Sequence, residues 1–270
     1  MVCDSFKNKV VVVTGAANGI GAAICHRFAR EGARIGLLDM DAKGVQAASD
    51  KLRTSGMDAV GIRCDVVDED ECTSALKEII GLYGGIDILV NNAGITQRSA
   101  FIDTQTSVYR RVMDVNFFGS LHCTKAAMAS LIERKGIIIV IESLAGIAPL
   151  LGRTGYCASK HALHGFFTSL RSELRATGTH IMLVCPGFVE TSLQSRALGG
   201  DGRVTTHPQS MVGKPVSAER VAGQIYKGAV KRKHLLVLTP VGKLTYWIHH
   251  FAPKLYERIM TRQLKEELMR

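Results

Sequence analysis

The most constraining feature of the sequence is a glycine-rich segment between an apolar run and an amphipathic stretch. Thr14–Gly21 reads TGAANGIG, directly after Lys9–Val13 and directly before Ala22–Glu31. A strand, a tight glycine turn and a helix in this order can hold a pyrophosphate. The helix N-terminus offers unpaired N–H groups, and glycines let phosphates approach the backbone. Glycine spacing alone is a weak signal, and here the flanking strand and helix supply the required context.

Apolar runs alternate with helix-period stretches for most of the chain. Several runs are continuously apolar, as expected for strands buried on both faces. The expected strands are Lys9–Val13, Arg34–Leu38, Ala59–Cys64, Asp87–Val90, Gly136–Ile141, Ile181–Cys185 and Leu235–Leu238. The expected helices are Ala22–Glu31, Asp41–Ser55, Glu69–Leu82, Ser107–Ile132, Tyr156–Ala176 and Ala218–Val230. This order predicts a single α/β domain, a doubly wound parallel sheet of about seven strands with helices on both faces.

Composition limits the class of protein. The 270 residues are 46% hydrophobic and 21% charged, which is typical of a soluble globular domain. No segment reaches 18 unbroken apolar residues, and Met1–Lys7 lacks the apolar core of a secretory signal. The seven cysteines are scattered and form no CxxC pair. We therefore expect a reduced, cytoplasmic setting, with no disulfide framework and no metal site.

Positive charge gathers in the last part of the chain. Residues 231–270 hold nine Lys or Arg and three Asp or Glu, which leaves +6 of the overall +10. No nucleic-acid motif accompanies this charge, so we expect no nucleic-acid partner. Apolar spacings of three and four predict two amphipathic helices within 241–270, with a break at Pro253. This extension could touch a membrane peripherally, or it could cover a pocket or pack on another subunit, which is the favoured reading.

The catalytic domain is expected to span residues 1–240. One segment in it interrupts the alternation of expected strands and helices. Gly187–Lys214 holds several glycines, two nearby prolines and few apolar residues. It follows a strand end, where open α/β sheets bind ligands. Long irregular segments in compact domains are usually lids or disordered loops. We expect a substrate lid over 190–215.

Polar residues follow three of the expected strands. Asp39 lies about 20 residues after the glycine turn, where a carboxylate can bind ribose hydroxyls and repel a 2′-phosphate, which favours NAD over NADP. Asn18 in the turn adds no positive charge. Alternatively, Asp39 could cap a turn or a helix, and Asp41 could cap the next helix equally well. Asp65 could accept from an adenine amino group or cap the following helix. The run from Asn91 to Gly94 could tie neighbouring strands together, although alone it is a turn signal.

Four further residues suggest acid–base chemistry. Tyr156 and Lys160 are four apart in an expected helix and share a face, although an exposed cation beside a ring would look the same. Ser143 ends an apolar run at the sheet edge that also carries the glycine turn. Asn116 lies midway along an expected long helix, where asparagine is unfavourable; its amide could equally be satisfied by the carbonyl four residues earlier or by water.

Together these residues make the chain resemble a short-chain dehydrogenase/reductase over nearly its whole length. The matching positions are Thr14, Gly15, Gly19, Gly21, Asp39, Asp65, Asn91-Asn92-Ala93-Gly94, Asn116, Ser143, Tyr156, Lys160, Pro186-Gly187 and Thr191. Each motif alone is modest evidence for the family, but their joint order and spacing are specific to it. The resemblance implies a three-layer Rossmann fold and an NAD-dependent oxidoreductase. One departure is Glu142, where relatives often carry a serine.

The resemblance also implies the role of each residue. Tyr156 would exchange the proton, Lys160 would bind the nicotinamide ribose, Ser143 would hold the substrate oxygen, and Asn116 would keep a water in a relay to Lys160. Substrate would contact Ser143 and Tyr156. The implied NAD-binding residues are Gly15, Asn18, Gly19, Ile20, Gly21, Asp39, Asp65, Val66, Asn92, Ala93, Gly94, Tyr156, Lys160, Pro186, Gly187, Val189 and Thr191. Relatives are commonly dimers or tetramers, which implies a homodimer or homotetramer through the two long helices.

The expected chemistry interconverts a secondary alcohol and a ketone. A tyrosine with a pKa of ~10 is a poor base at neutral pH, so we expect the Lys160 ammonium to lower the pKa of Tyr156. Aromatic and apolar residues in the extension suggest a bulky apolar substrate, such as a steroid, a retinoid or a lipid-like compound. A different hypothesis is a non-catalytic dinucleotide sensor or scaffold on the same fold, although a sensor would need none of Ser143, Tyr156 and Lys160 for proton transfer.

Overall fold

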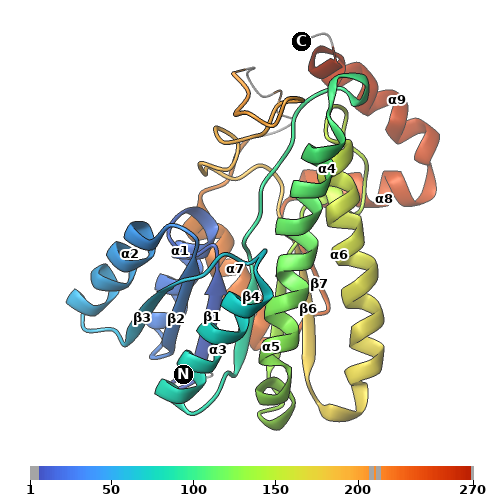
Figure 1. Cartoon of the computed structure of the whole chain (residues 1–270). Coiled ribbons are helices and arrows are strands. Elements are labelled where there is room, and N and C mark those ends of the chain that lie inside the picture. Colours follow the sequence, from blue (N-terminus) through green and yellow to red (C-terminus); the bar gives the residue numbers. More distant parts are fainter. Residues whose placement is uncertain (1–5, 207–209, 211–213, 269–270) are drawn as a thin grey trace.

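The central sheet is parallel throughout in the computed structural model, which describes residues 6–206, 210 and 214–268. The strand order is β3-β2-β1-β4-β5-β6-β7 (Figure 1). The strands are β1 Val10–Thr14, β2 Arg34–Asp39, β3 Ala59–Arg63, β4 Ile88–Asn91, β5 Ile137–Ile141, β6 His180–Cys185 and β7 Leu235–Val237. Each end lies within one residue of the sequence-based prediction, and the doubly wound fold is confirmed.

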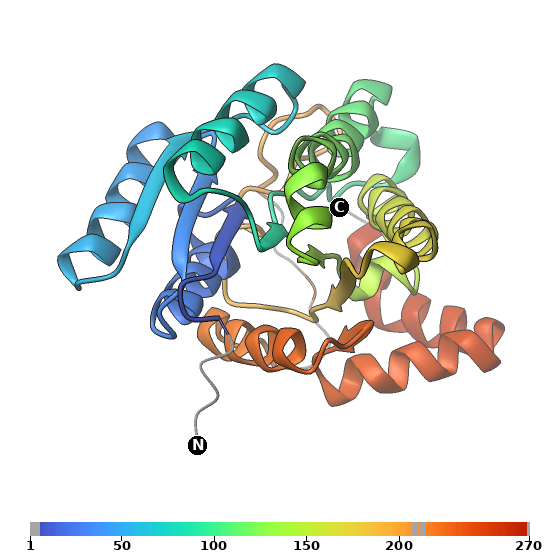
Figure 2. The ribbon, with the colours of Figure 1, turned by 90° about the horizontal axis from the view of Figure 1, so that it is seen from below.

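The continuously apolar strands serve two cores, one on each face of the sheet. In β1, Val11 and Val13 join one buried cluster, whereas Val10 and Val12 join the other. Side chains alternate along a strand, so a strand buried on both faces needs apolar residues at every position. Helices α1, α2 and α7 cover the first face and α3, α5 and α6 the second (Figure 2).

The helices of the main domain follow the expected pattern, with two corrections. They are α1 Gly19–Ala29, α2 Ala42–Thr54, α3 Glu69–Tyr83, α4 Thr106–Met113, α5 Gly119–Glu133, α6 Thr154–Glu173 and α7 Ala218–Val230. Helix α1 begins three residues before the expected Ala22, within the glycine turn itself. The expected helix 107–132 is helical without a break from Thr106 to Glu133, but its middle is a π-helical segment, Asp114–Phe118, between α4 and α5. Such π segments often occur at functional sites.

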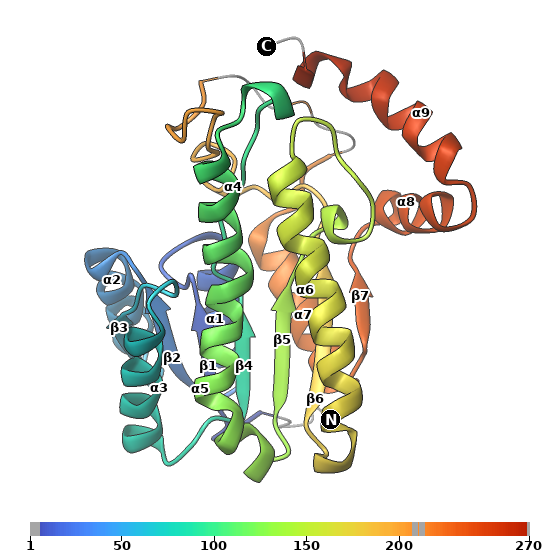
Figure 3. The ribbon, with the colours of Figure 1, turned by 45° about the vertical axis from the view of Figure 1, so that its right-hand side comes forward.

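The C-terminal extension forms two helices, as predicted. Helix α8 spans Pro240–Phe251, α9 spans Pro253–Leu264, and a 3₁₀ turn follows at Lys265–Leu268. Each helix begins with a proline, which lacks the N–H that would be unsatisfied there. The pair stands beyond edge strand β7, away from the main body (Figure 3). Residues 269–270, and residues 1–5 of the expected N-terminus, lie outside the described part of the chain.

One face of α9 packs on a loop of the main domain. Tyr256, Met260 and Leu264 recur at every fourth position and are buried against Ala148, with the flanking leucines at 150 and 151. The Tyr256 hydroxyl donates to the carbonyl oxygen of Pro149 at 2.8 Å. The extension is therefore fastened to the loop that joins β5 to α6.

The segment expected to be a lid has no helix among its described residues. It is held by short bridges, Val189 to Val216 and Gln97 to Leu198. Residues 207–209 and 211–213 of the expected lid lie outside the described part. The described lid residues run along the carboxyl ends of the strands, over the region where the site residues gather (Figure 1).

Candidate active site

A cavity of about 800 Å³ opens at the carboxyl ends of the strands. This volume falls within the usual range of ligand pockets. The predicted site residues that line it are Gly15, Asn18, Gly19, Ile20, Asp39, Asp65, Val66, Asn92, Ala93, Gly94, Ser143, Tyr156, Lys160, Pro186, Gly187, Val189 and Thr191. The structure thus brings together every predicted residue except Gly21 and Asn116, which lie behind the cavity wall.

The glycine turn is shaped by close backbone contacts. Gly15 has φ +64°, and a Cβ atom there would lie 2.9 Å from Cα of Ala93. A Cβ atom on Gly21 would lie 2.2 Å from the carbonyl oxygen of Gly15. Gly21 therefore allows the turn to close on itself, which explains why it is needed without lining the cavity.

Strands β1 and β4 are clamped together beneath the turn. The Asn92 side chain donates from Nδ2 to the carbonyl oxygens of Thr14, at 2.9 Å, and Gly15, at 3.0 Å. In return, Thr14 Oγ1 accepts from the backbone N–H groups of Asn92 and Ala93, both at 3.0 Å. The expectation that this asparagine run ties adjacent strands together is confirmed.

Asp39 links the end of β2 to the glycine turn. Its Oδ2 accepts from the backbone N–H of Ala17 at 3.0 Å, and its Oδ1 accepts from that of Asp41 at 3.1 Å. Asp41, and not Asp39, caps helix α2, by accepting from Gly44 N–H. A carboxylate has about four acceptor positions, so Asp39 keeps capacity for further donors in the cavity.

Asp65 lines the cavity beside Asp39 at the carboxyl end of β3. The alternative expectation that it caps the next helix was wrong. Asp68 is the N-cap of α3, with Oδ1 accepting from Asp70 and Glu71 N–H, both at 2.9 Å. Asp65 Oδ1 accepts only from Val67 N–H, at 3.1 Å, among the described residues.

Asn18 joins the glycine turn to the lid. Its Oδ1 accepts from Ser192 Oγ at 3.1 Å and from Arg196 Nη2 at 3.2 Å. Arg196 also bonds Ser192, so the three side chains form one cluster across the cavity mouth. The sequence identified Asn18 through its turn, but its lid partners depend on the fold.

Tyr156 lies near the start of α6 and is 8% exposed. Burial raises the pKa of its phenol, because the charged form loses hydration, whereas a hydrogen bond with Ser143 and the charge of Arg153 lower it. Ser143 Oγ also accepts from the Ala145 N–H at 3.1 Å. The cation that lowers the pKa of Tyr156 here is Arg153, and the expected lowering by Lys160 stays a prediction.

Lys160 is buried one helical turn beyond Tyr156. Its Nζ lies 5.8 Å from the centre of the Tyr156 ring and donates to the carbonyl oxygen of Ile141 at 2.9 Å. Burial lowers the pKa of its ammonium to about 8, and the negative charge of Glu142 opposes that shift. The side chain is thus held beside the last residue of β5.

Asn116 lies in the π-helical segment and its amide holds two elements together. Its Oδ1 accepts from the Ile95 N–H at 2.8 Å, and its Nδ2 donates to the Ile95 carbonyl oxygen at 3.0 Å. Nδ2 also donates to Ser159 Oγ at 2.8 Å. The side chain is satisfied by Ile95 and Ser159, a case that neither the relay nor its sequence-based alternatives anticipated. The water relay remains a prediction.

Comparison with known proteins decides the family. A family model described as short chain dehydrogenase matches residues 9–199, which is well over half of the chain. The chain belongs to the short-chain dehydrogenase/reductase family. Dehydrogenase/reductase SDR family member 7B of Rattus norvegicus is 34% identical over 269 residues, covering 97% of this chain and 83% of that protein. Its Danio rerio counterpart is 32% identical over 274 residues, covering 97% and 88%.

Solved structures agree on the fold of this short-chain dehydrogenase/reductase. A family member from Burkholderia phymatum, in complex with NAD, superposes with a TM-score of 0.82 at 23% identity, covering 93% of this chain and 96% of that one. A short-chain type dehydrogenase/reductase from Mycobacterium marinum gives 0.77 at 26% identity, covering 87% and 95%. The chain is therefore an oxidoreductase of this family with its fold.

Glu142 is a buried carboxylate that sequence reasoning treated only as a departure from the family pattern. Its Oε2 lies 3.2 Å from Nδ1 of His164 and accepts from Cys185 Sγ at 3.4 Å. Its Oε1 is buried with no hydrogen-bond partner among the described residues. Its place directly before Ser143 was the available signal for a functional role.

Arg153 is a second buried ion in the same short-chain dehydrogenase/reductase site, and sequence reasoning missed it. The guanidinium is 4% exposed, and its Nη1 donates to Gln194 Oε1 at 3.2 Å and to Thr96 Oγ1 at 3.4 Å. Its Nη2 has no partner among the described residues. Proximity to Tyr156 in the sequence was the only signal, because Gln194 comes from the lid.

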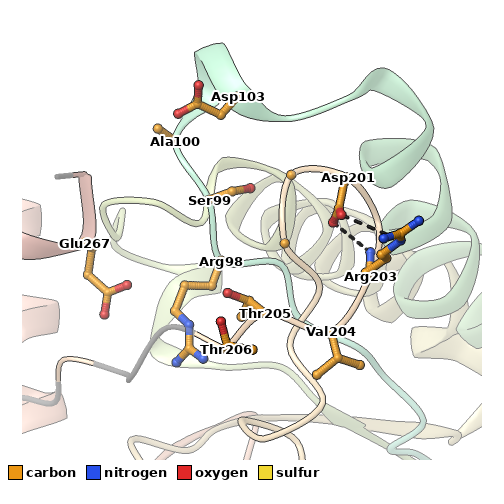
Figure 4. A pocket seen from close by; sticks show the side chains of 12 residues that line it. Arg98, Ser99, Ala100, Asp103, Asp201, Arg203, Val204, Thr205, Thr206 and Glu267 are labelled. Atoms are coloured by element: carbon orange, nitrogen blue, oxygen red, sulfur yellow. Dashed lines mark hydrogen bonds and ion pairs between the residues drawn. The ribbon is translucent and has the colours of Figure 1, made fainter. Parts of the chain in front are cut away.

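A second, smaller cavity of about 570 Å³ lies between the 98–103 loop and the lid (Figure 4). It shares Val204 with the main cavity. Asp201 and Arg203 form an ion pair of 3.9 Å on its lid side, and Glu267 borders it from the C-terminal 3₁₀ turn. Glu267 Oε1 also accepts from Ser210 N–H at 2.7 Å. The C-terminal extension of this enzyme thus reaches the lid.

Proposed function

We propose that the chain interconverts a secondary alcohol and a ketone with NAD(H) as the hydride carrier. The observation that carries the proposal is the convergence of Ser143, Tyr156 and Lys160 on one wall of a cavity that also contains the glycine turn and Asp39. These three side chains supply an oxygen-binding donor, a proton-transferring phenol and a cation. Their common cavity is large enough for a ligand to contact all of them.

The residues fit a dinucleotide on structural grounds. The glycine turn at the start of α1 presents backbone N–H groups, and a Cβ atom at Gly15 would fill the cradle. Asn92 to Gly94 and Pro186 to Thr191 would hold the rest of the molecule. When bound, NAD supplies a hydride acceptor and NADH a hydride donor.

The acid–base step is carried by this chain's own residues. In the oxidation direction Tyr156 takes the alcohol proton, and in the reduction direction it returns it. Ser143 donates to the substrate oxygen while negative charge is present on it. The cation of Arg153 favours the tyrosinate form, which opposes the effect of burial on Tyr156.

NAD is favoured over NADP by charge at one end of the cavity. Asp39 and Asp65 line this end, beside Met40 and Val67. The cavity-lining residues that follow β2 and β3 include no Lys or Arg in the described part of the chain. A 2′-phosphate here would meet two carboxylates with no counter-charge. The NAD complex of the Burkholderia phymatum relative supports the same proposal.

A bulky apolar substrate is favoured by the opposite end of the cavity. Apolar side chains from the β4–α4 segment, the β5–α6 loop, the β6 end and the lid line this region. They include Ile95, Leu144, Leu150, Phe188, Leu193 and Leu198. Steroid-, retinoid- or lipid-like alcohols would bury their carbon skeleton against such a wall.

The test is an absorbance assay with purified enzyme, NAD and secondary alcohols graded by size and polarity. We expect NADH formation that rises with substrate apolarity, and a loss of roughly 10²- to 10⁴-fold in kcat for Tyr156→Phe with NAD affinity retained. A preference for small polar polyols would remove the apolar-substrate proposal. Equal turnover by Tyr156→Phe would remove the assigned chemistry.

The alternative of a non-catalytic dinucleotide sensor is separated by the same assay. A sensor would bind NAD without forming NADH from any alcohol in the series. It would also show the same NAD affinity and the same inactivity in wild-type and Tyr156→Phe chains. Turnover in the wild type alone excludes it.

A second candidate function is carried by an exposed apolar ridge on α8 and α9. Leu244, Trp247, Phe251 and Leu255 are each at least half exposed, and Trp247 stacks on Phe251 at 5.5 Å between ring centres. The exposed bases nearby are Lys243, Lys254, Arg258, Arg262 and Lys265. Aromatic and basic groups together suit an interfacial helix, so we propose peripheral contact with an anionic membrane surface. Across the described residues, no helix has the length and apolarity to cross a bilayer.

Liposome sedimentation tests this contact. We expect the wild-type chain to sediment with vesicles rich in phosphatidylserine. A Trp247→Ser/Phe251→Ser double variant should remain in the supernatant. Phe101→Ser is the matched control, because Phe101 is 70% exposed elsewhere on the surface. Equal amounts of wild type and double variant in the supernatant would contradict the proposal.

We also propose a homodimer or homotetramer through the outer faces of α5 and α6. These two helices run side by side along one face of the molecule (Figure 3), and α5 exposes Ile132 there while Phe118 is exposed just before its start. Light scattering coupled to size exclusion would give the mass, and a monomer at micromolar concentration would contradict the proposal.

A reducing, cytoplasmic setting remains a proposal as well. Its support is that the six described cysteines are buried free thiols. Fluorescence microscopy of the tagged full-length chain tests it, and an exclusively organellar signal would contradict it.

A further inference from the structure

Lys160 is a buried cation whose neighbours must compensate its charge. It is 4% exposed, and among the described residues its only hydrogen-bond acceptor is the Ile141 carbonyl oxygen. An ammonium that leaves water loses several kcal/mol of hydration, which one neutral carbonyl does not restore. A buried lysine without an anion nearby therefore tends to lose its proton.

Glu142 is the anion placed to compensate that cation. It follows directly after Ile141, whose carbonyl accepts from Lys160, and both Glu142 and Lys160 line the cavity. Its carboxylate contacts His164, which lies one helical turn after Lys160 on α6. The charge of Glu142 favours the protonated form of Lys160 and thereby raises the lysine pKa.

His164 fixes the Glu142 carboxylate from the solvent side. The ring Nδ1 lies 3.2 Å from Oε2, and the histidine side chain is one-third exposed whereas that of Glu142 is fully buried. Hydrogen bonding to Glu142 raises the pKa of His164, so the contact favours the positively charged ring. The remaining oxygen, Oε1, is buried and has no partner among the described residues.

The surroundings of Glu142 contain three potential cations and one thiol. Lys160, His164 and Arg171 approach from α6, and Cys185 approaches from β6. Burial and the Glu142 charge raise the pKa of the Cys185 thiol, so it remains a neutral donor.

We propose that Glu142, clamped by His164, is a positioning residue that keeps the buried Lys160 protonated in the active site. The role rests on the proposed function, because a charged Lys160 is useful only where it holds a cofactor beside Tyr156. A neutral side chain at position 142 would have no charge to perform it.

The test is a direct titration of Lys160 in the full-length enzyme. Lysine side chains are labelled with ¹³C at Cε, and Lys160 is assigned by its absence in Lys160→Arg. We expect a midpoint near pH 8 in the wild type, as burial and Glu142 together set it. Glu142→Gln should lower the midpoint by at least about one pH unit, which is roughly a tenfold change in the ratio of the two forms.

Two further variants keep the experiment decisive. Glu142→Ser removes the same charge with a smaller polar side chain, so it supplies a second neutral variant if Gln is not tolerated, and it should show the same change. Asp114→Asn is the matched control, because Asp114 is another acid of the same cavity and its loss should leave the Lys160 midpoint in place. An unchanged midpoint in both Glu142 variants would overturn the proposal.

Activity supplies an independent readout. The alkaline limb of kcat/KM should move to lower pH in Glu142→Gln by the same interval as the NMR midpoint. The titration itself needs no substrate. A lowered midpoint in an enzyme that turns over no alcohol would refute the proposed function and leave only the effect of the Glu142 charge on Lys160 standing. Turnover with an unchanged midpoint would refute the role of Glu142 and leave the proposed function standing.

Discussion

The two halves of the cavity satisfy their polar groups in different ways. Around the glycine turn, Thr14, Asn92 and Asp39 bond backbone groups a few ångströms away, and each contact joins neighbouring strand ends. Around the proposed chemical centre, Glu142 and Arg153 are buried ions, each with one side-chain atom that lacks a partner among the described residues. The hydrogen bonds make the first half rigid. The second half contains buried charged groups that can act on a reacting molecule.

The largest expected effect is on the rigid half. Gly15→Val places a β-branched side chain where φ is +64° and a Cβ atom would lie 2.9 Å from Cα of Ala93. Left-handed backbone alone costs a valine about 1–2 kcal/mol, and the clash adds to it. We expect NAD binding to fall by more than about 100-fold in calorimetric titration.

Gly165→Ala in α6 is the control for this substitution. No atom lies within 4 Å of the Cβ position at Gly165, so alanine should stabilise the helix by up to about 1 kcal/mol in urea unfolding. If Gly15→Val binds NAD normally, the turn is not the rigid cradle described here.

Asp39→Asn is expected to change cofactor choice. The substitution removes the negative charge that would repel a 2′-phosphate and weakens the acceptor for ribose hydroxyls. Hydrogen bonds to charged groups contribute about 1.5–3 kcal/mol, so the KM for NAD should rise roughly 10- to 100-fold. The KM for NADP should fall at the same time.

The fall in the KM for NADP is the informative part. Loss of the Ala17 contact could loosen the turn and weaken both cofactors together. Only the removal of a specific repulsion improves one while it weakens the other. Parallel weakening of NAD and NADP would show that Asp39 acts on the turn alone.

Sequence reasoning succeeded where the site depends on strand ends. Thr14, Asp39, Asn92 and Ser143 each follow an apolar run, and parallel strands bring their carboxyl ends to one edge, so position in the chain gives position in space. The same logic predicted all seven strands, because burial on both faces requires continuous apolar runs.

It failed where partners come from distant segments. The contacts of Arg153 join the β5–α6 loop to Gln194 of the lid, and those of Asn18 reach Ser192 and Arg196. The π-helical segment at Asn116 was also missed, because its apolar pattern differs little from that of a continuous helix. Periodicity reports local structure, and these features depend on tertiary contact.

Arg153→Gln tests whether the buried cation of Arg153 acts on Tyr156 in the chemical half of the cavity. The Arg153 cation lowers the pKa of Tyr156, so its removal should raise that pKa. The rise of kcat/KM with pH would then occur at higher pH, and activity at neutral pH would fall by about tenfold for every pH unit by which the Tyr156 pKa rises.

Arg110→Gln is the matched control, because Arg110 also lines the cavity but is exposed. A uniform loss of activity at every pH would indicate that Arg153 serves packing only.

The smallest expected effect comes from Tyr256→Phe in the C-terminal extension, which lies outside both halves of the cavity. Tyr256→Phe removes only the hydroxyl that donates to the Pro149 carbonyl oxygen at 2.8 Å, so the free energy of unfolding should fall by about 0.5–1.5 kcal/mol. Because Leu150 of the same loop lines the apolar end of the cavity, the KM for large apolar alcohols should rise two- to threefold, as expected when about 0.5 kcal/mol of binding free energy is lost. The KM for NAD should stay constant, since the contact between Tyr256 and Pro149 involves none of the residues assigned to the dinucleotide. Tyr246→Phe on α8 is the control, expected to change neither value. A rise in the NAD KM alone would place the influence of the extension on the rigid half and remove the distinction between the two.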